Sequence, residues 1–502
     1  MSYVIGIDSS TTATKAVVWD REGRAVAEGR SEFGLAIPRP GWHEQDAEDW
    51  WRSCAIAVTQ ALASVNGSDI EAICVTHQRE TFACLDEQGR PVRPAIVWMD
   101  VRATRQVAEL GSEAIHRLTG KPPDTTPALY KLLWLREHEP ETLERTRWVV
   151  DVHAFLVHRL TGTWRTTTAC ADPLGLIDLE RGDWSGDLLA RVGLSRERVP
   201  ELFPPGAVIG EVSAAAAAEL GLPIGLPVIG GAGDGQSAAL GANATRPGQA
   251  YINLGTAVVA GTMSERYAWD RSFRTLFAPV PGTYLMETLL QGGTYTVNWF
   301  LERIVMLDTA RLGLGLLDVD VLETAAARLG PGAEGLVLVP YMASAQTPYW
   351  DPSARGILFG LAGHHGRQHI FRAIMEGIAF EQRLAFEGME PRLEQPIELL
   401  LMTGGGARSP LWRQIVANVT GKAVVVCREA ETTSLGAGMQ AAAAAGWHGS
   451  LVGAAEAMSG VGARHTPDAS TAARYDDLYA VYREIYPRTA PLHGALQRAS
   501  ED

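Results

Sequence analysis

Short apolar runs separated by polar turns dominate the beginning of the chain. Residues 3–8 and 15–20 read as two short strands, and residues 25–33 form a third after a turn that contains a glycine. Residues 46–63 have a helical hydrophobic period with acids in the first turn, and residues 70–81 read as a strand that ends in polar side chains. We therefore predict an antiparallel strand meander, then a helix, then another strand.

The same pattern continues to the middle of the chain. Residues 126–140 predict a helix with a proline near its start, and residues 149–162 predict a second helix that ends at a glycine. The alanine-rich residues 213–220 predict a surface helix. Residues 226–243 then combine a buried strand, a glycine cluster and a helix of small residues.

The second half repeats the style of the first. A strand, a turn of small residues and a strand recur at residues 249–264. Further strands and helices alternate at residues 335–342, 370–389, 398–409 and 434–446. This alternation predicts an α/β fold of two domains, residues 1–246 and 247–502, with the boundary near residues 245–248.

Composition narrows the class of protein. A chain of 502 residues exceeds the size of one hydrophobic core, and 46% apolar with 20% charged residues is typical of a folded globular protein. The net charge of −14 argues against a nucleic-acid partner, because phosphate backbones require a basic face.

Cysteine usage and the N-terminus indicate the compartment. The five cysteines form no CxxC pair, so we expect neither a zinc site nor a disulfide framework. No signal peptide pattern precedes the first strand, and no apolar run reaches membrane-spanning length, which excludes a membrane partner. We expect a cytoplasmic protein.

Four turns of small residues could hold phosphate groups. They are Asp8 with its following hydroxyls, residues 230–235, residues 253–257 and residues 403–409. Backbone N–H groups in such turns bind anions, and a carboxylate beside phosphates can hold Mg²⁺. None of the four is a P-loop or a dinucleotide fingerprint, and each alone is typical of an ordinary turn or helix cap.

Taken together, the four turns resemble the actin, hexokinase and heat-shock-chaperone ATPase fold, with two ribonuclease H-like domains and an interdomain cleft. Within that fold the chain resembles the FGGY carbohydrate kinases over nearly its whole length. The resemblance rests on "IGIDSSTTATKAVVWD", "GWHEQDAEDWW", "GGAGDGQSAALG", "NLGTA", "TPYWDPSARGILFGLAGHHGRQHIFRAIMEGIAF" and "LMTGGGARSPLWRQIVANVTG".

The resemblance implies phosphoryl transfer from ATP with Mg²⁺. Asp234 would be the base that takes the acceptor proton, with a plain helix cap as the alternative, and Asp8 and Asp234 would hold the metal. The nucleotide would contact Ser10, Thr11, Thr12, Lys15, Gly255, Thr256, Gly404, Gly405, Gly406 and Arg408. The N-terminal domain would then bind the sugar, the C-terminal domain would bind the nucleotide, and a hinge near residues 245–250 would close to expel water.

One residue departs from the family pattern. The family usually has glycine where this chain has Ser10, so the backbone would have to approach the phosphates without that freedom. Two tryptophans, Trp50 and Trp51, predict core packing, with a homodimer face as the alternative.

The acceptor face is expected around residues 75–104. The resemblance implies contacts from His77, Gln78, Arg79, Glu80, Trp98, Asp100 and Asp234. An adjacent arginine and glutamate suit vicinal hydroxyls, because one donates and the other accepts, although a surface ion pair is the alternative.

Two subfamilies compete for the acceptor. "QRET" resembles the glycerol kinases, but Thr126 stands where those enzymes carry a tyrosine before the helix lysine, Lys131. "RPAIVWMDVR" and "GLIDLERGDWS" resemble the xylulokinases, which usually have Met-His-Gly in place of Gln78-Arg79-Glu80. We favour D-xylulose, with glycerol, erythritol or another short polyol as the alternative. A sugar-binding protein without transfer activity is a third hypothesis, because a fold does not fix function.

Overall fold

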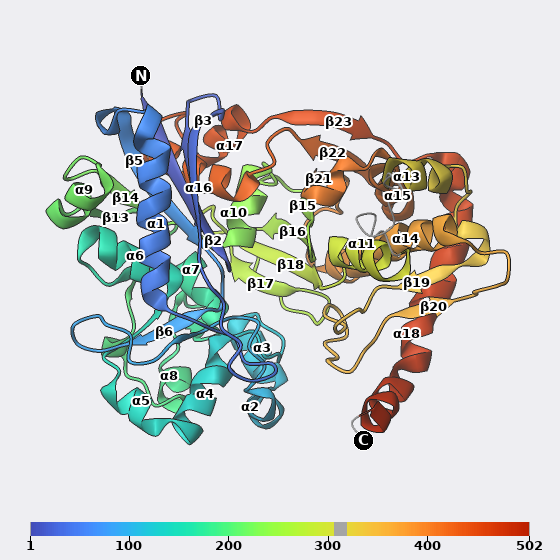
Figure 1. The fold of residues 1–502 in the computed structure, drawn as a ribbon, viewed down its shortest axis with the longest axis horizontal. Helices are drawn as coiled ribbons and strands as arrows, with labels where there is room; N and C mark the ends of the chain where they lie inside the picture. Colours follow the sequence, from blue (N-terminus) through green and yellow to red (C-terminus); the bar gives the residue numbers. More distant parts are fainter. Residues whose placement is uncertain (1, 306–318, 501–502) are drawn as a thin grey trace, which may run out of the picture.

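Two mixed β-sheets of the same topology form the framework of the molecule (Figure 1). The structure is a computed structural model that describes residues 2–305 and 319–500. The first sheet has the strand order β13-β14-β5-β1-β2-β3. Its strands are β1 Tyr3–Ser9, β2 Ala13–Trp19, β3 Ala25–Glu32, β5 Ile70–His77, β13 Val208–Glu211 and β14 Pro227–Ile229.

The second sheet repeats this pattern in the other half of the chain. Its order is β17-β18-β16-β15-β21-β22-β23. Its strands are β15 Gln249–Leu254, β16 Val258–Ser264, β17 Arg274–Phe277, β18 Tyr284–Leu290, β21 Leu399–Thr403, β22 Ala423–Cys427 and β23 Val461–His465. In each sheet the first strand pairs antiparallel with the second and parallel with a later strand, β5 or β21. The predicted repeat is therefore confirmed.

Helices cover both sheets. In the first half they are α1 Ala47–Ala61, α2 Thr104–Leu110, α3 Glu113–Thr119, α4 Ala128–His138, α5 Pro140–Arg145, α6 Val152–Thr161, α7 Thr168–Ala171, α8 Gly186–Arg191, α9 Ala214–Leu220 and α10 Asp234–Gly241. In the second half they are α11 Thr294–Trp299, α13 Val319–Ala327, α14 Arg367–Met389, α15 Pro410–Thr420, α16 Thr432–Ala444, α17 Leu451–Met458 and α18 Ala472–Ser500.

Smaller sheets complete the fold. A four-stranded sheet is formed by β4 Glu44–Gln45, β7 Ala95–Ile96, β6 Phe82–Leu85 and β8 Trp148–Asp151. Pairs of short strands are β9 Arg165–Thr167 with β12 Glu201–Phe203, β10 Ile177–Asp178 with β11 Asp183–Trp184, and β19 Val337–Val339 with β20 Ile357–Phe359.

The two halves exchange a helix at their junction. Helix α16 of the second half packs on β1 and β5 of the first sheet, where Leu435 joins a buried cluster with Val4 and Cys74. Helix α10 of the first half contributes Ala239 to a cluster with Tyr251 of the second sheet. A division of the chain after residue 246, which stays a prediction, would therefore remove a covering helix from each sheet.

Glycines allow α10 and α16 to touch where they pack together. A Cβ atom at Gly241 would lie 1.9 Å from the carbonyl oxygen of Thr432, and one at Gly436 would lie 2.0 Å from that of Ser237. Any larger side chain would push the helices apart, so these small residues set the distance between the two halves.

Three sequence predictions are resolved by the fold. Residues 149–151 belong to β8, and the predicted helix begins only at Val152, because Asp151 caps it by accepting a hydrogen bond from the Ala154 N–H. Trp50 and Trp51 are buried, which confirms core packing and removes the observation that suggested a dimer face. Among the described residues, no helix combines the length and apolarity that a membrane span needs.

Candidate active site

The end of β1, next to the turn into β2, carries a carboxylate with an unpartnered oxygen. Asp8 pairs with Lys15 across the two strands, and its Oδ1 is buried with no hydrogen-bond partner in the described part of the chain. Burial raises the pKa of Asp8 to about 8, Asp234 and Glu431 add to this effect, and Lys15 opposes it. Lys15 itself lies 3.1 Å from Glu28 and from Glu431, so two carboxylates share its charge.

Ser10 fits the turn without the freedom of glycine. Its φ lies outside the left-handed region, and its N–H and hydroxyl donate to the carbonyl of Ala13 at 2.9 and 2.8 Å. Thr11 is half-buried and Thr12 is exposed beside it. The serine therefore closes the turn and leaves the two threonines at the surface, where phosphate oxygens could approach.

Parallel strands bring Asp234 beside the predicted acceptor segment. β14 pairs with β5, and a bridge between His77 and Gly233 extends this pairing beyond the strand ends. Gly233 occupies the cap position of α10, and Asp234 follows as its first residue with 41% of its side chain exposed. One oxygen, Oδ1, accepts a hydrogen bond from the Gly235 N–H at 2.7 Å. The carboxylate thus stands at the carboxyl edge of the sheet, as ligand-binding groups do in α/β folds.

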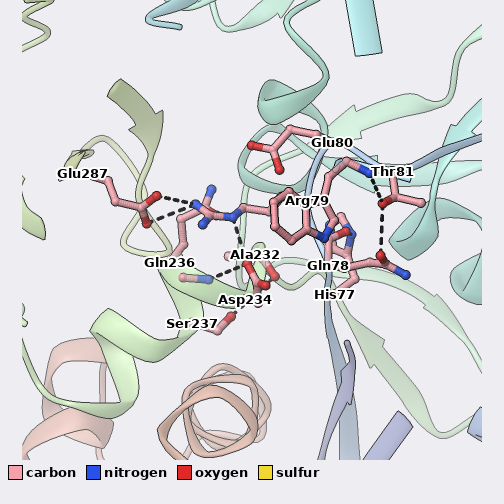
Figure 2. A network of polar contacts seen from close by, with 12 residues as sticks. His77, Gln78, Arg79, Glu80, Thr81, Ala232, Asp234, Gln236, Ser237 and Glu287 are labelled. Carbon is pink, nitrogen blue, oxygen red and sulfur yellow. Dashed lines mark hydrogen bonds and ion pairs between the residues drawn. The ribbon is translucent and has the colours of Figure 1, made fainter. Parts of the chain in front are cut away.

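Arg79 and Glu80 belong to a chain of alternating charges that crosses between the two halves (Figure 2). Nε of Arg79 lies 2.8 Å from Oδ1 of Asp234, and its Nη1 donates to Glu287 on β18 at 3.0 and 3.1 Å. Nη1 of Arg274 on β17 donates to Glu80 at 2.8 Å. All except Asp234 are buried. The alternative of a weak surface ion pair is therefore wrong for these residues.

Glu80 has an unusual backbone conformation. Its φ is 60°, in the left-handed region that residues with a Cβ rarely occupy. Such a conformation costs about 1–3 kcal/mol and persists only where the surroundings hold it. The contact with Arg274 supplies part of that restraint.

A buried lysine supports the loop that carries Trp98. Nζ of Lys131 donates to the carbonyls of Val97, Trp98 and Thr126 at 3.1, 2.9 and 2.8 Å. The indole N–H of Trp98 donates to the hydroxyl of Thr11 at 3.0 Å. This hydrogen bond joins the Trp98 loop to the small-residue turn that follows Asp8.

Two further predicted residues lie beneath the site. His77 is fully buried, its Nδ1 lies 2.7 Å from the carbonyl oxygen of Gln78, and burial lowers its pKa. The side chain of Gln78 donates to Gln45 at 2.9 Å and accepts from Thr81 at 3.1 Å. Both residues are placed to orient the segment that follows them.

Asp100 has its carboxylate engaged elsewhere. Its oxygens accept from the His43 N–H at 2.7 Å and from the N–H groups of Arg102 at 2.8 to 3.0 Å, and the side chain is fully buried. Each oxygen of Asp100 thus already accepts two hydrogen bonds, which leaves no free lone pair for a sugar hydroxyl in this structure, and its contact with the acceptor stays a prediction.

The predicted phosphate-binding turn at residues 253–257 connects β15 to β16. Thr256 is exposed in it, and the first N–H groups of α11, from Thr294 and Tyr295, donate to the carbonyls of Gly255 and Thr256 at 2.8 and 3.2 Å. Helix α11 thus fixes the turn from behind.

The small-residue turn at residues 403–409 lines a large cavity in the second half. Gly404 has a φ of 88°, and a Cβ there would lie 2.3 Å from Asn253. A cavity of about 970 Å³ is bordered by Gly405, Gly406 and Arg408 together with α11, α13 and α14. Its size suits a nucleoside.

Another cavity lies between the two halves. It has a volume of about 820 Å³ and is bordered by α3 and the following loop on one side and by residues 267–271, Trp350 and Arg392 on the other. It does not include the predicted site residues.

The residues present fit Mg²⁺. The described residues contain no cluster of three or more His, Cys, Asp or Glu that could hold a metal ion. Mg²⁺ bound to a nucleotide takes only one or two carboxylates and keeps its waters, so such a cluster is not needed. The unpartnered oxygen of Asp8 and the exposed carboxylate of Asp234 are the groups that would hold it.

The fold and these paired turns define a two-domain sugar kinase architecture, and comparisons with known proteins identify the family. Residues 3–241 match the N-terminal domain of the FGGY family of carbohydrate kinases, and residues 250–445 match its C-terminal domain. The chain therefore belongs to the FGGY carbohydrate kinases.

Its relatives include several kinds of kinase. The chain is 29% identical to the xylulose kinase of Bacillus subtilis, over 99% of both chains. It is 27% identical to a gluconokinase of Bacillus subtilis, over 96% of this chain and 95% of the relative, and 33% identical to the glycerol kinase of Trichlorobacter lovleyi, over 89% and 91%. A crystal structure of xylulose kinase from Rhodospirillum rubrum superposes with a TM-score of 0.88 at 30% identity, covering 98% and 100%.

Two site residues were missed by sequence analysis. Arg274 and Glu287 lie in strands with no motif of their own, and the two partners in the Arg79–Glu287 contact are 208 residues apart in the chain. Both are charged side chains within otherwise apolar strand segments, which is the signal that could have found them.

Proposed function

We propose that this carbohydrate kinase transfers the γ-phosphoryl group of ATP to a hydroxyl of a small sugar in the cytoplasm, with D-xylulose as the acceptor. The observation that carries the proposal is the position of Asp234. Its partly exposed carboxylate stands at the start of α10 beside Arg79, and its charge acts on the carboxyl group of Asp8, which has an unpartnered oxygen. A non-catalytic sugar-binding protein would not need a base placed in this way.

The chemistry follows from this placement. Asp234 accepts the proton of the acceptor hydroxyl, and the oxygen of that hydroxyl forms a bond to the γ-phosphorus. The bond between the γ-phosphorus and the oxygen that bridges to the β-phosphate breaks, which releases ADP. Arg79 orients the carboxylate through the 2.8 Å contact. Two turns would approach the phosphates, one with Thr11 and Thr12 and the other with Thr256. Mg²⁺ would neutralise the negative charge of the phosphates. Closure of the two halves about a hinge near residues 245–250 would exclude water.

D-xylulose is supported by the full-length similarity to xylulose kinases. Relatives of that name from three genera are 28–29% identical over at least 98% of this chain. The side chain of Thr126 is also smaller than the tyrosine expected of a glycerol kinase at this position. Its hydroxyl donates a hydrogen bond to Asp124 at 2.9 Å.

A short polyol is the second candidate. It is favoured by the resemblance of residues 78–81 to the glycerol kinases and by the 33% identity to a glycerol kinase.

Coupled ADP release tests both candidates. Purified protein with ATP-Mg²⁺ is assayed on D-xylulose, D-ribulose, L-ribulose, L-xylulose, glycerol, erythritol, xylitol and D-gluconate. We expect turnover on D-xylulose that Asp234→Ala abolishes. Turnover on glycerol or erythritol alone would replace the acceptor, and turnover on none of them would favour the non-catalytic hypothesis. ATP hydrolysis that is equally fast without an acceptor would contradict closure.

A further inference from the structure

Arg274 and Glu287 form a buried pair that faces the acceptor segment from the second half. They are direct neighbours across the antiparallel strands β17 and β18, so their side chains project from the same face of the sheet. Arg274 is 6% exposed and Glu287 is 0% exposed. Burial of two charges costs desolvation free energy unless each charge is paired and hydrogen-bonded, so we ask what this pair contributes to the site.

Glu287 is matched by more donors than a structural ion pair needs. It accepts from Arg274 at 2.6 and 2.8 Å, from Arg79 at 3.0 and 3.1 Å, and from the hydroxyl of Tyr251 at 2.7 Å. Burial raises the pKa of Glu287, but the charges of Arg79 and Arg274 outweigh it and lower the pKa to about 2. Glu287 therefore keeps a full negative charge beside Arg79.

The cations that form ion pairs in the acceptor region are already matched by carboxylates, and Lys131 has its Nζ engaged by three backbone carbonyls. Arg79 lies against Glu287 and Asp234, and Arg274 lies against Glu287 and Glu80. Lys121, the third, lies 3.4 Å from Asp172.

Among the described residues, these ion pairs join three cations to four carboxylates, which are Asp234, Glu287, Glu80 and Asp172. A sugar acid brings its own carboxylate, which requires a cation that is not already neutralised. An uncharged sugar or polyol has no such requirement, and its hydroxyls can both donate to carboxylates and accept from guanidinium groups.

We propose that Glu287 is a specificity-determining residue that acts through Arg79: it cancels the charge of Arg79, so the site takes uncharged polyhydroxyl acceptors and rejects sugar acids. This inference rests on the proposed kinase function but not on the choice of D-xylulose. It separates the chain from the gluconokinases among its relatives.

The test compares acceptor selectivity between a variant that removes a negative charge from the site and a variant that removes a positive charge. The ratio of kcat/KM for D-gluconate to kcat/KM for the best uncharged acceptor is measured for the wild type, Glu287→Gln and Arg274→Gln. Glu287→Gln removes one negative charge and leaves Arg79 with Asp234 alone and Arg274 with Glu80 alone, so we expect the ratio to rise at least about tenfold. Arg274→Gln leaves Glu287 and Glu80 in excess, so we expect the ratio to fall.

The matched control is Glu376→Gln. Glu376 is paired with Arg372 in α14, and both are as buried as the Arg274–Glu287 pair, but their other contacts are Ala326, Gly332 and Tyr475, outside the acceptor segment. This variant should lose stability without a change in the ratio. A purely structural role for Glu287 would lower turnover on all acceptors equally and leave the ratio unchanged.

Binding supplies a readout that does not depend on turnover or on one variant. Quenching of tryptophan fluorescence reports the affinity of the wild type for D-xylulose, glycerol and D-gluconate, and Arg274→Gln alone suffices if Glu287→Gln does not fold. A wild type that prefers D-gluconate, in turnover or in binding, overturns the inference while leaving the kinase class intact. A ratio unchanged in the folded variants overturns it as well.

Discussion

Nε of Arg79 lies 2.8 Å from Oδ1 of Asp234, which joins the predicted acceptor-binding side chain directly to the predicted base. Arg79 is buried and cannot move away, whereas 41% of the Asp234 side chain is open to solvent. If Asp234 is the base, we expect the acceptor to meet the guanidinium as it approaches, so that binding and proton removal are coupled through this contact.

Replacing Asp234 by asparagine should abolish proton acceptance without disturbing the fold. We expect kcat to fall about 10³-fold, while the acceptor KM and the Tm change little, because the amide retains the size of the carboxylate. Coupled ADP release and thermal unfolding measure these quantities. A variant that keeps more than a tenth of the wild-type kcat would remove Asp234 from the role of base.

Asp8 should make the protein less stable as pH rises. Its pKa is about 8 in the folded protein and near 4 in the unfolded chain, so between these values only the folded state holds the proton. Stability therefore falls from pH 4 to pH 8. With allowance for partial exposure, Asp8→Asn should be more stable by about 2 kcal/mol at pH 8 and about equal at pH 4, while turnover is lost.

Thermal unfolding without nucleotide or metal, followed from pH 4.5 to pH 8.5, checks this dependence. A difference in Tm that does not vary with pH would show that the carboxyl is ionised throughout.

Lys131→Met should weaken acceptor binding more than nucleotide binding. The lysine satisfies three buried carbonyls, and their loss of a donor costs about 1–3 kcal/mol and releases the loop of Trp98. We expect a higher KM for the acceptor and an unchanged KM for ATP. Equal effects on both constants would indicate general destabilisation instead.

Gly405→Val should interfere with the nucleotide alone. A Cβ at Gly405 meets no atom within 4 Å, and the residue borders the 970 Å³ cavity. The added side chain would occupy ligand space, so we expect the KM for ATP to rise about tenfold with an unchanged Tm. At Gly406 a Cβ would lie 2.7 Å from the ring of Trp412, so Gly406→Val should lower stability as well. An unchanged KM for ATP in Gly405→Val would place the nucleotide elsewhere.

Gly436→Val should separate the two halves. Its Cβ would lie 2.0 Å from the carbonyl oxygen of Ser237, and backbone cannot yield as a flexible side chain does. We expect a loss of about 3 kcal/mol, seen as a lower urea midpoint. Gly186→Ala, where a Cβ meets nothing within 4 Å, is the control and should stay within about 1 kcal/mol of the wild type.

Much of the architecture was predictable because its signals are local. The strand runs around Asp8 and the "NLGTA" turn have the same pattern, and the sheets confirm that they are equivalent. The prediction failed at residues 149–151, where apolar residues before a cap belong to a strand. Short apolar runs do not distinguish strand from helix by periodicity alone.

The sequence by itself determined the order of strands and turns, the family and the candidate residues, because hydrophobic period, glycine clusters and motif spacing are properties of neighbouring residues. Only the tertiary structure decided that Arg102 engages Asp100, that α10 and α16 exchange sheets, and that Glu287 reaches Arg79. Apart from Asp100 and Arg102, which are two residues apart in one loop, these contacts join residues from different elements that are far apart in the chain. Their partners are selected by packing and charge in the folded state, and no local pattern records that selection.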